Sequence, residues 1–286
     1  MFDAIVLGSN GQLGSYLISS LGLQGFKIMG LNRKNLNIET IEQLRHSLSR
    51  YRSKYVINCI ALTDVNFCEQ NAKMAYEINA ILVSNLAQIC GDLSMNLIHV
   101  STDFVFDGKD KTARKFDSNT NPISIYGKSK LEGEQSIQIN NQCENTILRT
   151  GALYGGHRSN FVKYVVESLK ENRYVNCAFD QLIQPTHVGY IATIVGSVVA
   201  NNLNLGIFHS TSTGLVSKYD FAIKICKILD LDSQKIKKCD FDSISGSTIR
   251  PKFSNLEEDR LDLIGMKATP NWEEMLDEYS HTILGY

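Results

Sequence analysis

The stretch AIVLGSNGQLG, Ala4–Gly14, decides the fold. Its first four residues form an apolar run typical of a strand buried on both faces, and three glycines in the spacing G-x-x-G-x-x-G follow. In a strand–turn–helix unit, the first glycine permits a tight turn, the second lets the backbone approach a pyrophosphate, and the third lets the helix pack on the strand. A glycine-rich turn can also occur without a ligand. Here the pattern predicts a dinucleotide-binding turn because more strand–helix units follow it.

Apolar strands and amphipathic helices alternate along the first 150 residues. We expect strands at residues 4–7, 27–30, 55–59, 96–100 and 146–149, and helices at 13–21, 41–50, 72–90 and 129–139. Later helices are expected at 161–171, 188–201 and 219–229, with a late strand of the main sheet at 206–209. The alternation predicts an α/β fold with a Rossmann-type, doubly wound parallel sheet.

The division into domains follows from where this alternation loosens. We expect residues 1–150 and 185–215 to form a dinucleotide-binding Rossmann domain. Residues 151–184 and 216–286 are expected to form a smaller C-terminal α/β lobe that binds the substrate. At 286 residues with 43% hydrophobic residues, the chain has enough apolar material for both.

Bulk composition excludes several functions. A formal net charge of -1 argues against a nucleic-acid partner. The longest apolar helix expected, near residues 191–200, is too short to cross a bilayer, and the start Met1-Phe2-Asp3 has no basic leader region. The seven cysteines are scattered without a C-x-x-C pair, and the six histidines lie on separate elements. We therefore expect a cytoplasmic protein with reduced thiols, no metal site and no membrane partner.

The loop after the second strand bears on the choice of cofactor. Rossmann domains that bind NAD place an acid there for the adenosine ribose, whereas this chain has Asn32-Arg33-Lys34. Two cations suit a 2′-phosphate, so we predict that NADPH is preferred and that NAD remains possible. Solvated loop residues are the alternative interpretation.

A Tyr-x-x-x-Lys pair, Tyr126 and Lys130, follows the fourth strand. On a helix these two side chains share a face, and a nearby ammonium lowers the pKa of a phenol from about 10, which makes it a usable acid or base. Thr102 lies just past the strand that ends at Val100, at the sheet edge where this architecture binds ligands. A surface tyrosine beside a lysine is the alternative, and the context favours catalysis.

Several longer motifs now indicate a family. They are GSNGQLG at 8–14, STDFVFDG at 101–108, YGKSKLEGE at 126–134, LRTGALYG at 148–155, NF at 160–161, DQLIQPT at 180–186 and RPKFSNLEEDRL at 250–261. In this order the chain resembles the extended short-chain dehydrogenases/reductases, and within them the dTDP-4-dehydrorhamnose reductase family. The resemblance covers nearly the whole chain and is far more specific than the glycine turn alone.

The resemblance implies roles for particular residues. Thr102 would hydrogen-bond the reacting carbonyl, Tyr126 would transfer the proton, and Lys130 would bind the nicotinamide ribose and tune Tyr126. The cofactor-binding residues implied are Gly8, Asn10, Gly11, Gln12, Leu13, Gly14, Asn32, Arg33, Asn37, Ile38, Ala61, Leu62, Thr63, Tyr126 and Lys130. The substrate-binding residues implied are Thr102, Asp103, Phe104, Asn160, Gln181, Pro185 and Arg250, of which the last four could equally be structural.

The implied reaction is transfer of a hydride from NADPH to the ketone of a nucleotide-linked 4-keto-6-deoxy sugar in cell-surface polysaccharide biosynthesis. The best single substrate is dTDP-4-dehydrorhamnose, which would become dTDP-rhamnose. The sugar nucleotide is the expected partner, and the resemblance allows a homodimer.

The chain departs from the family pattern at a few positions. Asn37, Leu62 and Asn66 replace a frequent acid, tyrosine and aspartate, Ala152 replaces a frequent tryptophan of the sugar pocket, and Arg260 replaces a lysine. Related dehydratases place a glutamate where this chain has Phe104, which cannot move a proton. An epimerase, and a non-catalytic NADP-binding regulatory subunit resembling that of methionine adenosyltransferase, remain as alternatives.

Overall fold

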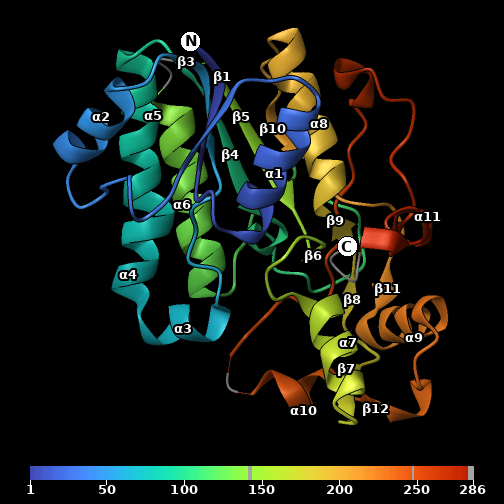
Figure 1. Ribbon diagram of the computed structural model, residues 1–286. Helices are drawn as coiled ribbons and strands as arrows, with labels where there is room; N and C mark the ends of the chain where they lie inside the picture. Colours follow the sequence, from blue (N-terminus) through green and yellow to red (C-terminus); the bar gives the residue numbers. More distant parts are fainter. Residues whose placement is uncertain (141–143, 247, 283–286) are drawn as a thin grey trace.

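The computed structural model describes residues 1–140, 144–246 and 248–282. Its main sheet has six strands in the order β10-β5-β4-β3-β1-β2, and every neighbouring pair is parallel (Figure 1). The strands are β1 (Phe2–Leu7), β2 (Ile28–Leu31), β3 (Ser53–Asn58), β4 (Asn96–Thr102), β5 (Asn145–Thr150) and β10 (Gly206–His209). The predicted α/β fold with a Rossmann-type sheet is confirmed, including the late strand at 206–209.

Helices cover both faces of this sheet, as Figure 1 shows. On one face lie α1 (Gln12–Leu23) and α8 (Val188–Asn201), and on the other lie α2 (Ile41–Ser49), α5 (Leu82–Asp92) and α6 (Ile125–Ile139). Ala4 and Val6 of β1 enter the first core, and Ile5 and Leu7 enter the second. Because both faces of β1 are buried, its sequence is continuously apolar rather than alternating.

Two expected helices differ from the structure. The helix expected at 72–90 consists of α4 (Ala72–Tyr76), a π-helical turn η1 (Glu77–Ile81) and α5. The helix expected from Ser129 begins at Ile125, because the side chain of Ser124 caps it by accepting a hydrogen bond from the Gly127 N–H at 3.1 Å. The earlier start puts Tyr126 on the same helix as Lys130.

The second half of the chain adds small sheets and helices around a separate core. The strand pairs are β6 (Leu153–Tyr154) with β9 (Thr186–His187), β7 (Val175–Ala178) with β12 (Ile236–Cys239), and β8 (Leu182–Ile183) with β11 (Val216–Ser217).

The remaining α-helices of the whole fold are α3 (Val65–Gln70), α7 (Phe161–Lys170), α9 (Lys218–Leu229), α10 (Phe241–Ser245) and α11 (Trp272–Glu278). Short 3₁₀ turns are η2 (Asp103–Val105), η3 (Ser233–Lys235), η4 (Leu261–Ile264) and η5 (Ser280–Thr282).

No described helix is long and apolar enough to span a bilayer. Five of the described cysteines are free thiols, namely Cys59, Cys68, Cys177, Cys226 and Cys239, and Cys143 lies outside the described residues. Within the same ranges, no three His, Cys, Asp or Glu side chains are grouped so that they could hold a metal ion.

Candidate active site

The glycine turn lies between β1 and α1, beside the loop that follows β3. Gly8 has φ +77°, and a β-carbon there would lie 3.1 Å from the carbonyl of Cys59. A β-carbon on Gly14 would lie 2.4 Å from the oxygen of Gly8, so the third glycine lets α1 pack against the turn. The sheet order reverses between β1 and β3, which is where this architecture binds nucleotides. The cradle therefore fits a pyrophosphate held by amides at the start of α1.

The predicted adenosine residues lie next to this turn. The side-chain amide of Asn32 donates to Asn10 Oδ1 at 3.4 Å, and Arg33 is exposed one residue later. Asn37, which stands in place of an acid, accepts a hydrogen bond from the Glu39 N–H at 3.0 Å. A further cation was missed from the sequence: Arg158 Nε donates to the carbonyl of Asn10 at 2.8 Å. Only the tertiary fold brings Arg158 to this turn.

The segment after β3 is held by a residue that sequence reasoning also missed. Asn79 accepts a hydrogen bond from the Leu62 N–H at 2.9 Å and donates to the Leu62 carbonyl at 3.0 Å. It donates as well to Ser129 Oγ of α6 at 3.1 Å. Asn79 is fully buried in the π-helical turn η1, and such turns often mark functional sites. This one fixes Ala61–Thr63 beside the start of α6.

Thr102 and Tyr126 meet at the carboxyl end of the sheet. Thr102 is the last residue of β4, Tyr126 lies in the first turn of α6, and their side chains lie close together. Phe104 packs edge-on against the Tyr126 ring at 5.5 Å between centroids. Burial raises the Tyr126 pKa far above its usual value. The phenol is therefore protonated at neutral pH, which is the form that an acid catalyst requires.

Lys130 has contacts different from those expected. Its Nζ donates to the Val100 carbonyl at 2.6 Å and lies 3.1 Å from His99 Nε2. Burial lowers the Lys130 pKa to about 8, although the Glu134 carboxylate and Cys59 oppose this. The expected lowering of the Tyr126 pKa by Lys130 is not what these contacts produce. Lys130 directs its donors at β4, and burial dominates the Tyr126 pKa.

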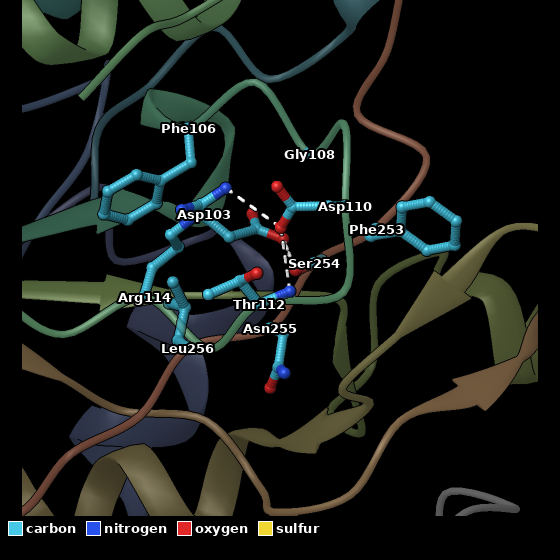
Figure 2. A pocket seen from close by; sticks show the side chains of 10 residues that line it. All are labelled: Asp103, Phe106, Gly108, Asp110, Thr112, Arg114, Phe253, Ser254, Asn255 and Leu256. Atoms are coloured by element: carbon cyan, nitrogen blue, oxygen red, sulfur yellow. Dashed lines mark hydrogen bonds and ion pairs between the residues drawn. The ribbon is translucent and has the colours of Figure 1, made fainter. Parts of the chain in front are cut away.

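Asp103 lies next to Thr102 and is almost fully buried. Its carboxylate accepts hydrogen bonds from Thr102 Oγ1, at 2.9 Å, and from Ser254 Oγ. Burial raises the Asp103 pKa despite these bonds. Figure 2 shows Asp103 and Ser254 joined at a small cavity between residues 106–114 and 253–256. Asp103 was predicted to bind substrate, but in this structure its carboxylate oxygens accept hydrogen bonds from two protein side chains. Ser254 was not predicted, although it belongs to the RPKFS motif.

The remaining predicted substrate residues lie in different settings. Arg250 donates to Asn66 Oδ1 at 2.5 Å. Gln181 is buried and donates to the Pro251 carbonyl at 3.4 Å, while its Oε1 has no partner among the described residues. Pro185 is buried in the loop before β9. Asn160 caps α7 by accepting from the Lys163 N–H at 3.1 Å, which is the structural interpretation left open above.

One more cation joins this group. Lys218, at the start of α9, has a pKa lowered by burial and then by the charge of Arg250, while the Asp103 carboxylate opposes the shift. Lys218 and Arg250 are therefore close enough to repel, an arrangement that a bound anion relieves. No sequence motif indicated Lys218, because this residue lies outside every motif that indicated the family.

Comparisons with known proteins agree with this geometry. The family model described as RmlD substrate binding domain matches residues 3–284. The spore coat polysaccharide biosynthesis protein SpsK of Bacillus subtilis is 32% identical over 98% of this chain and 97% of its own. A dTDP-4-keto-6-deoxy-D-glucose reductase of Streptomyces niveus is 30% identical over 96% of this chain and 95% of its own. The crystal structure of dTDP-4-dehydrorhamnose reductase from Bacillus anthracis in complex with NADP has a TM-score of 0.92 and 31% identity, covering 97% of this chain and 98% of that one.

The fold and the site define an NAD(P)-dependent oxidoreductase of the extended short-chain dehydrogenase/reductase class. Within that class the chain belongs to the dTDP-4-dehydrorhamnose reductase family, a family of sugar-nucleotide 4-ketoreductases.

Proposed function

We propose that the protein uses NADPH to reduce the 4-keto group of a nucleotide-linked 4-keto-6-deoxy sugar. The best single named substrate is dTDP-4-dehydrorhamnose, and the product would serve cell-surface polysaccharide synthesis. The observation that carries the proposal is the position of the buried Tyr126 phenol next to Thr102, at the sheet edge beside the glycine turn. A protonated, oriented phenol at that edge is suited to protonating a carbonyl oxygen as it gains a hydride.

Each cofactor contact in the proposal has a residue to make it. Amides of the turn from Gly8 to Gly14 hold the pyrophosphate. Arg33 faces the 2′-phosphate. Arg158 lies beside the same turn, because its Nε donates to the Asn10 carbonyl. Lys130 meets the nicotinamide ribose. When bound, the nicotinamide supplies the hydride to the carbonyl carbon, and Tyr126 Oη gives its proton to the carbonyl oxygen.

The substrate contacts in the proposal come from the second half of the chain. Lys218 and Arg250 neutralise the diphosphate, because two neighbouring cations gain most from an anion between them. The unpartnered Oε1 of Gln181 accepts a hydrogen bond from the ligand. Residues 1–150 and 185–215 then serve the cofactor, and residues 151–184 and 216–286 serve the sugar nucleotide.

A direct assay tests the proposal. Purified protein is incubated with NADPH and a panel of dTDP-, UDP-, GDP- and CDP-linked 4-keto-6-deoxy sugars, and NADPH consumption and the reduced sugar are followed. We expect turnover with a dTDP-sugar and its loss in Tyr126→Phe. Tight NADP binding without turnover of any sugar would instead favour the non-catalytic regulatory subunit.

A further inference from the structure

A buried histidine, outside every predicted site, holds Lys130 from one side. His99 lies on β4, three residues before Thr102, and is fully buried. Its Nε2 lies 3.1 Å from Lys130 Nζ, and its Nδ1 lies 3.1 Å from Asn58 Nδ2. The orientation of Asn58 is fixed in turn, because its Oδ1 accepts a hydrogen bond from the Ile60 N–H at 3.0 Å.

Counting hydrogen atoms in this chain of contacts gives a direction to each bond. Since Asn58 presents its amide oxygen to Ile60, its NH₂ group faces the histidine and donates to Nδ1. A neutral imidazole carries one N–H, so the proton of His99 must be on Nε2, where it points at Lys130. A neutral amine has a lone pair to accept that bond, whereas an ammonium has none.

Protonation of Lys130 would therefore disrupt the buried hydrogen bond between His99 Nε2 and Lys130 Nζ. His99 Nε2 would have to become the acceptor, and its proton would move to Nδ1, against the NH₂ group of Asn58. Turning the Asn58 amide would only move the conflict to the Ile60 N–H. Two buried N–H donors that face each other without an acceptor raise the free energy of the site, so this hydrogen-bond network disfavours the ammonium form of Lys130.

The charged and titratable groups around Lys130 are consistent with this. Burial keeps His99 neutral by lowering its pKa well below the ordinary value. Cys59, after β3, and Glu134, one turn later on α6, favour the ammonium. Glu134, however, is already paired with Arg149 of β5 at 2.7 Å and accepts a bond from Ser101. Glu134 is therefore shared with Arg149, and among the described residues that act on the Lys130 pKa no other carboxylate balances an ammonium at Lys130.

We propose that His99 is a positioning residue that, with Asn58, favours the neutral amine of Lys130 in the free protein, so that under mildly alkaline conditions binding of the cofactor takes up a proton at Lys130. The inference rests on the proposed function only in taking NADP(H) as the ligand. On binding, a new N–H bond forms at Nζ with a proton from the buffer. The ammonium then turns its donors to the ribose hydroxyls and balances part of the phosphate charge.

The test counts protons. Calorimetric titration with NADP⁺ at about pH 8, in phosphate and in Tris, gives the protons taken up from the difference in heat between the two buffers. Because the Lys130 pKa is about 8, we expect uptake of about half a proton per site, rising toward one at higher pH. Lys130→Met should abolish the uptake, and Lys128→Met, an exposed change on the same helix, should leave it at the wild-type value.

Two further variants separate positioning from mere packing. Asn58→Asp keeps the shape and still accepts from Ile60, but its carboxylate draws the ring proton to Nδ1, which leaves Nε2 free to accept from an ammonium. In His99→Gln the amide can turn its oxygen to Lys130. Each should lower the proton uptake at least threefold while NADP⁺ still binds.

The outcomes are distinct. Unchanged uptake in Asn58→Asp and His99→Gln, or no uptake in the wild type, would overturn the role of His99 and leave the reductase proposal standing. Absence of NADP⁺ binding by the wild type would overturn the proposed function itself.

Discussion

Thr102 Oγ1 donates its one hydrogen bond to Asp103 Oδ1, at 2.9 Å. The same oxygen accepts a bond from the Phe104 N–H at 3.2 Å. A hydroxyl has a single proton, so Thr102 cannot donate to a second acceptor while it donates to Asp103. Asp103 thus fixes the direction of the Thr102 proton, and in the proposed reaction Thr102 must leave Asp103 before it can donate to a substrate carbonyl.

The first prediction concerns Asp103→Asn. The amide keeps the volume but offers one oxygen for two donors, Thr102 and Ser254, so the Thr102 hydroxyl loses its fixed direction. We expect kcat/KM to fall roughly tenfold, equivalent to about 1.4 kcal/mol. Steady-state kinetics measures this, with Asp110→Asn on the exposed loop as the control. An unaltered kcat/KM would mean that Asp103 does not orient Thr102.

The same variant has a stability signature. Burial raises the folded-state pKa of Asp103 above its unfolded value. For such a group the contribution to stability is fully present below the unfolded pKa and is lost as the pH rises through the folded pKa. Asparagine does not ionise, so the variant does not lose stability in this way. The melting temperature of Asp103→Asn minus that of the wild type should therefore rise as the pH is raised from about 4 to about 7. A constant difference across that range would contradict the shift.

Replacing the proton donor is the second prediction. Tyr126→Phe should lower kcat by roughly 10²–10⁴-fold, the usual range for a positioned acid. NADPH affinity should barely change, because the ring still packs against Phe104. Since burial raises the Tyr126 pKa, the wild-type reduction rate should show no loss from tyrosine ionisation between about pH 6 and about pH 9. Near wild-type turnover of the variant would exclude Tyr126 as the acid.

The sequence was sufficient for those parts of the site that local patterns determine. The glycine turn and the Tyr126–Lys130 spacing each lie within one strand–helix unit, so periodicity and composition locate them. The start of α6 was missed because it depends on the cap at Ser124, and the interruption of the long helix depends on the π-helical turn at Asn79. The bond between Asp103 and Ser254 joins residues 151 positions apart, and no local pattern encodes it.

Cofactor choice is the subject of the third prediction. Arg33 is exposed beside Asn32, so solvent weakens its contact with a 2′-phosphate below that of a buried pair. We expect NADPH to bind about tenfold more tightly than NADH, a difference of about 1.4 kcal/mol, and Arg33→Gln to remove most of that preference. Titration calorimetry with both cofactors measures it, and Arg50→Gln, exposed at the end of α2, is the control. Equal affinities in the wild type would refute the prediction.

A fourth prediction addresses the buried ion pair beneath the site. Arg149 and Glu134 lie 2.7 Å apart with 3% and 1% of their side chains exposed. Removing one partner leaves the other charge buried, so Glu134→Gln should lower the free energy of unfolding by about 3–5 kcal/mol. The exposed pair Arg173–Glu171 is the matched control, and Glu171→Gln should cost less than about 1 kcal/mol. Similar costs for the two variants in chemical denaturation would refute the prediction.

The fifth prediction concerns the sugar pocket at Ala152. Its neighbour Gly151 would place a β-carbon 3.6 Å from Asp103 Oδ2, so this segment borders the site. Two aromatic rings that could replace the family's indole are engaged elsewhere. Tyr154 packs on His187 at 5.2 Å between centroids, and Phe253 lies under Lys111 at 5.7 Å. A missing indole removes a surface of some 150–250 Å², and we expect the space to admit a bulkier sugar.

We therefore expect the wild type to reduce a 4-keto-6-deoxy sugar with an added group, or with different stereochemistry, at least as well as dTDP-4-dehydrorhamnose. Ala152→Trp should refill the space and shift the ratio of kcat/KM values toward dTDP-4-dehydrorhamnose by about tenfold, because losing or gaining such a contact changes transition-state binding by about 1.4 kcal/mol. Ala152→Val, which adds little volume, serves as the control. If the wild type already prefers dTDP-4-dehydrorhamnose by tenfold or more, other side chains fill the space and the pocket is of ordinary size.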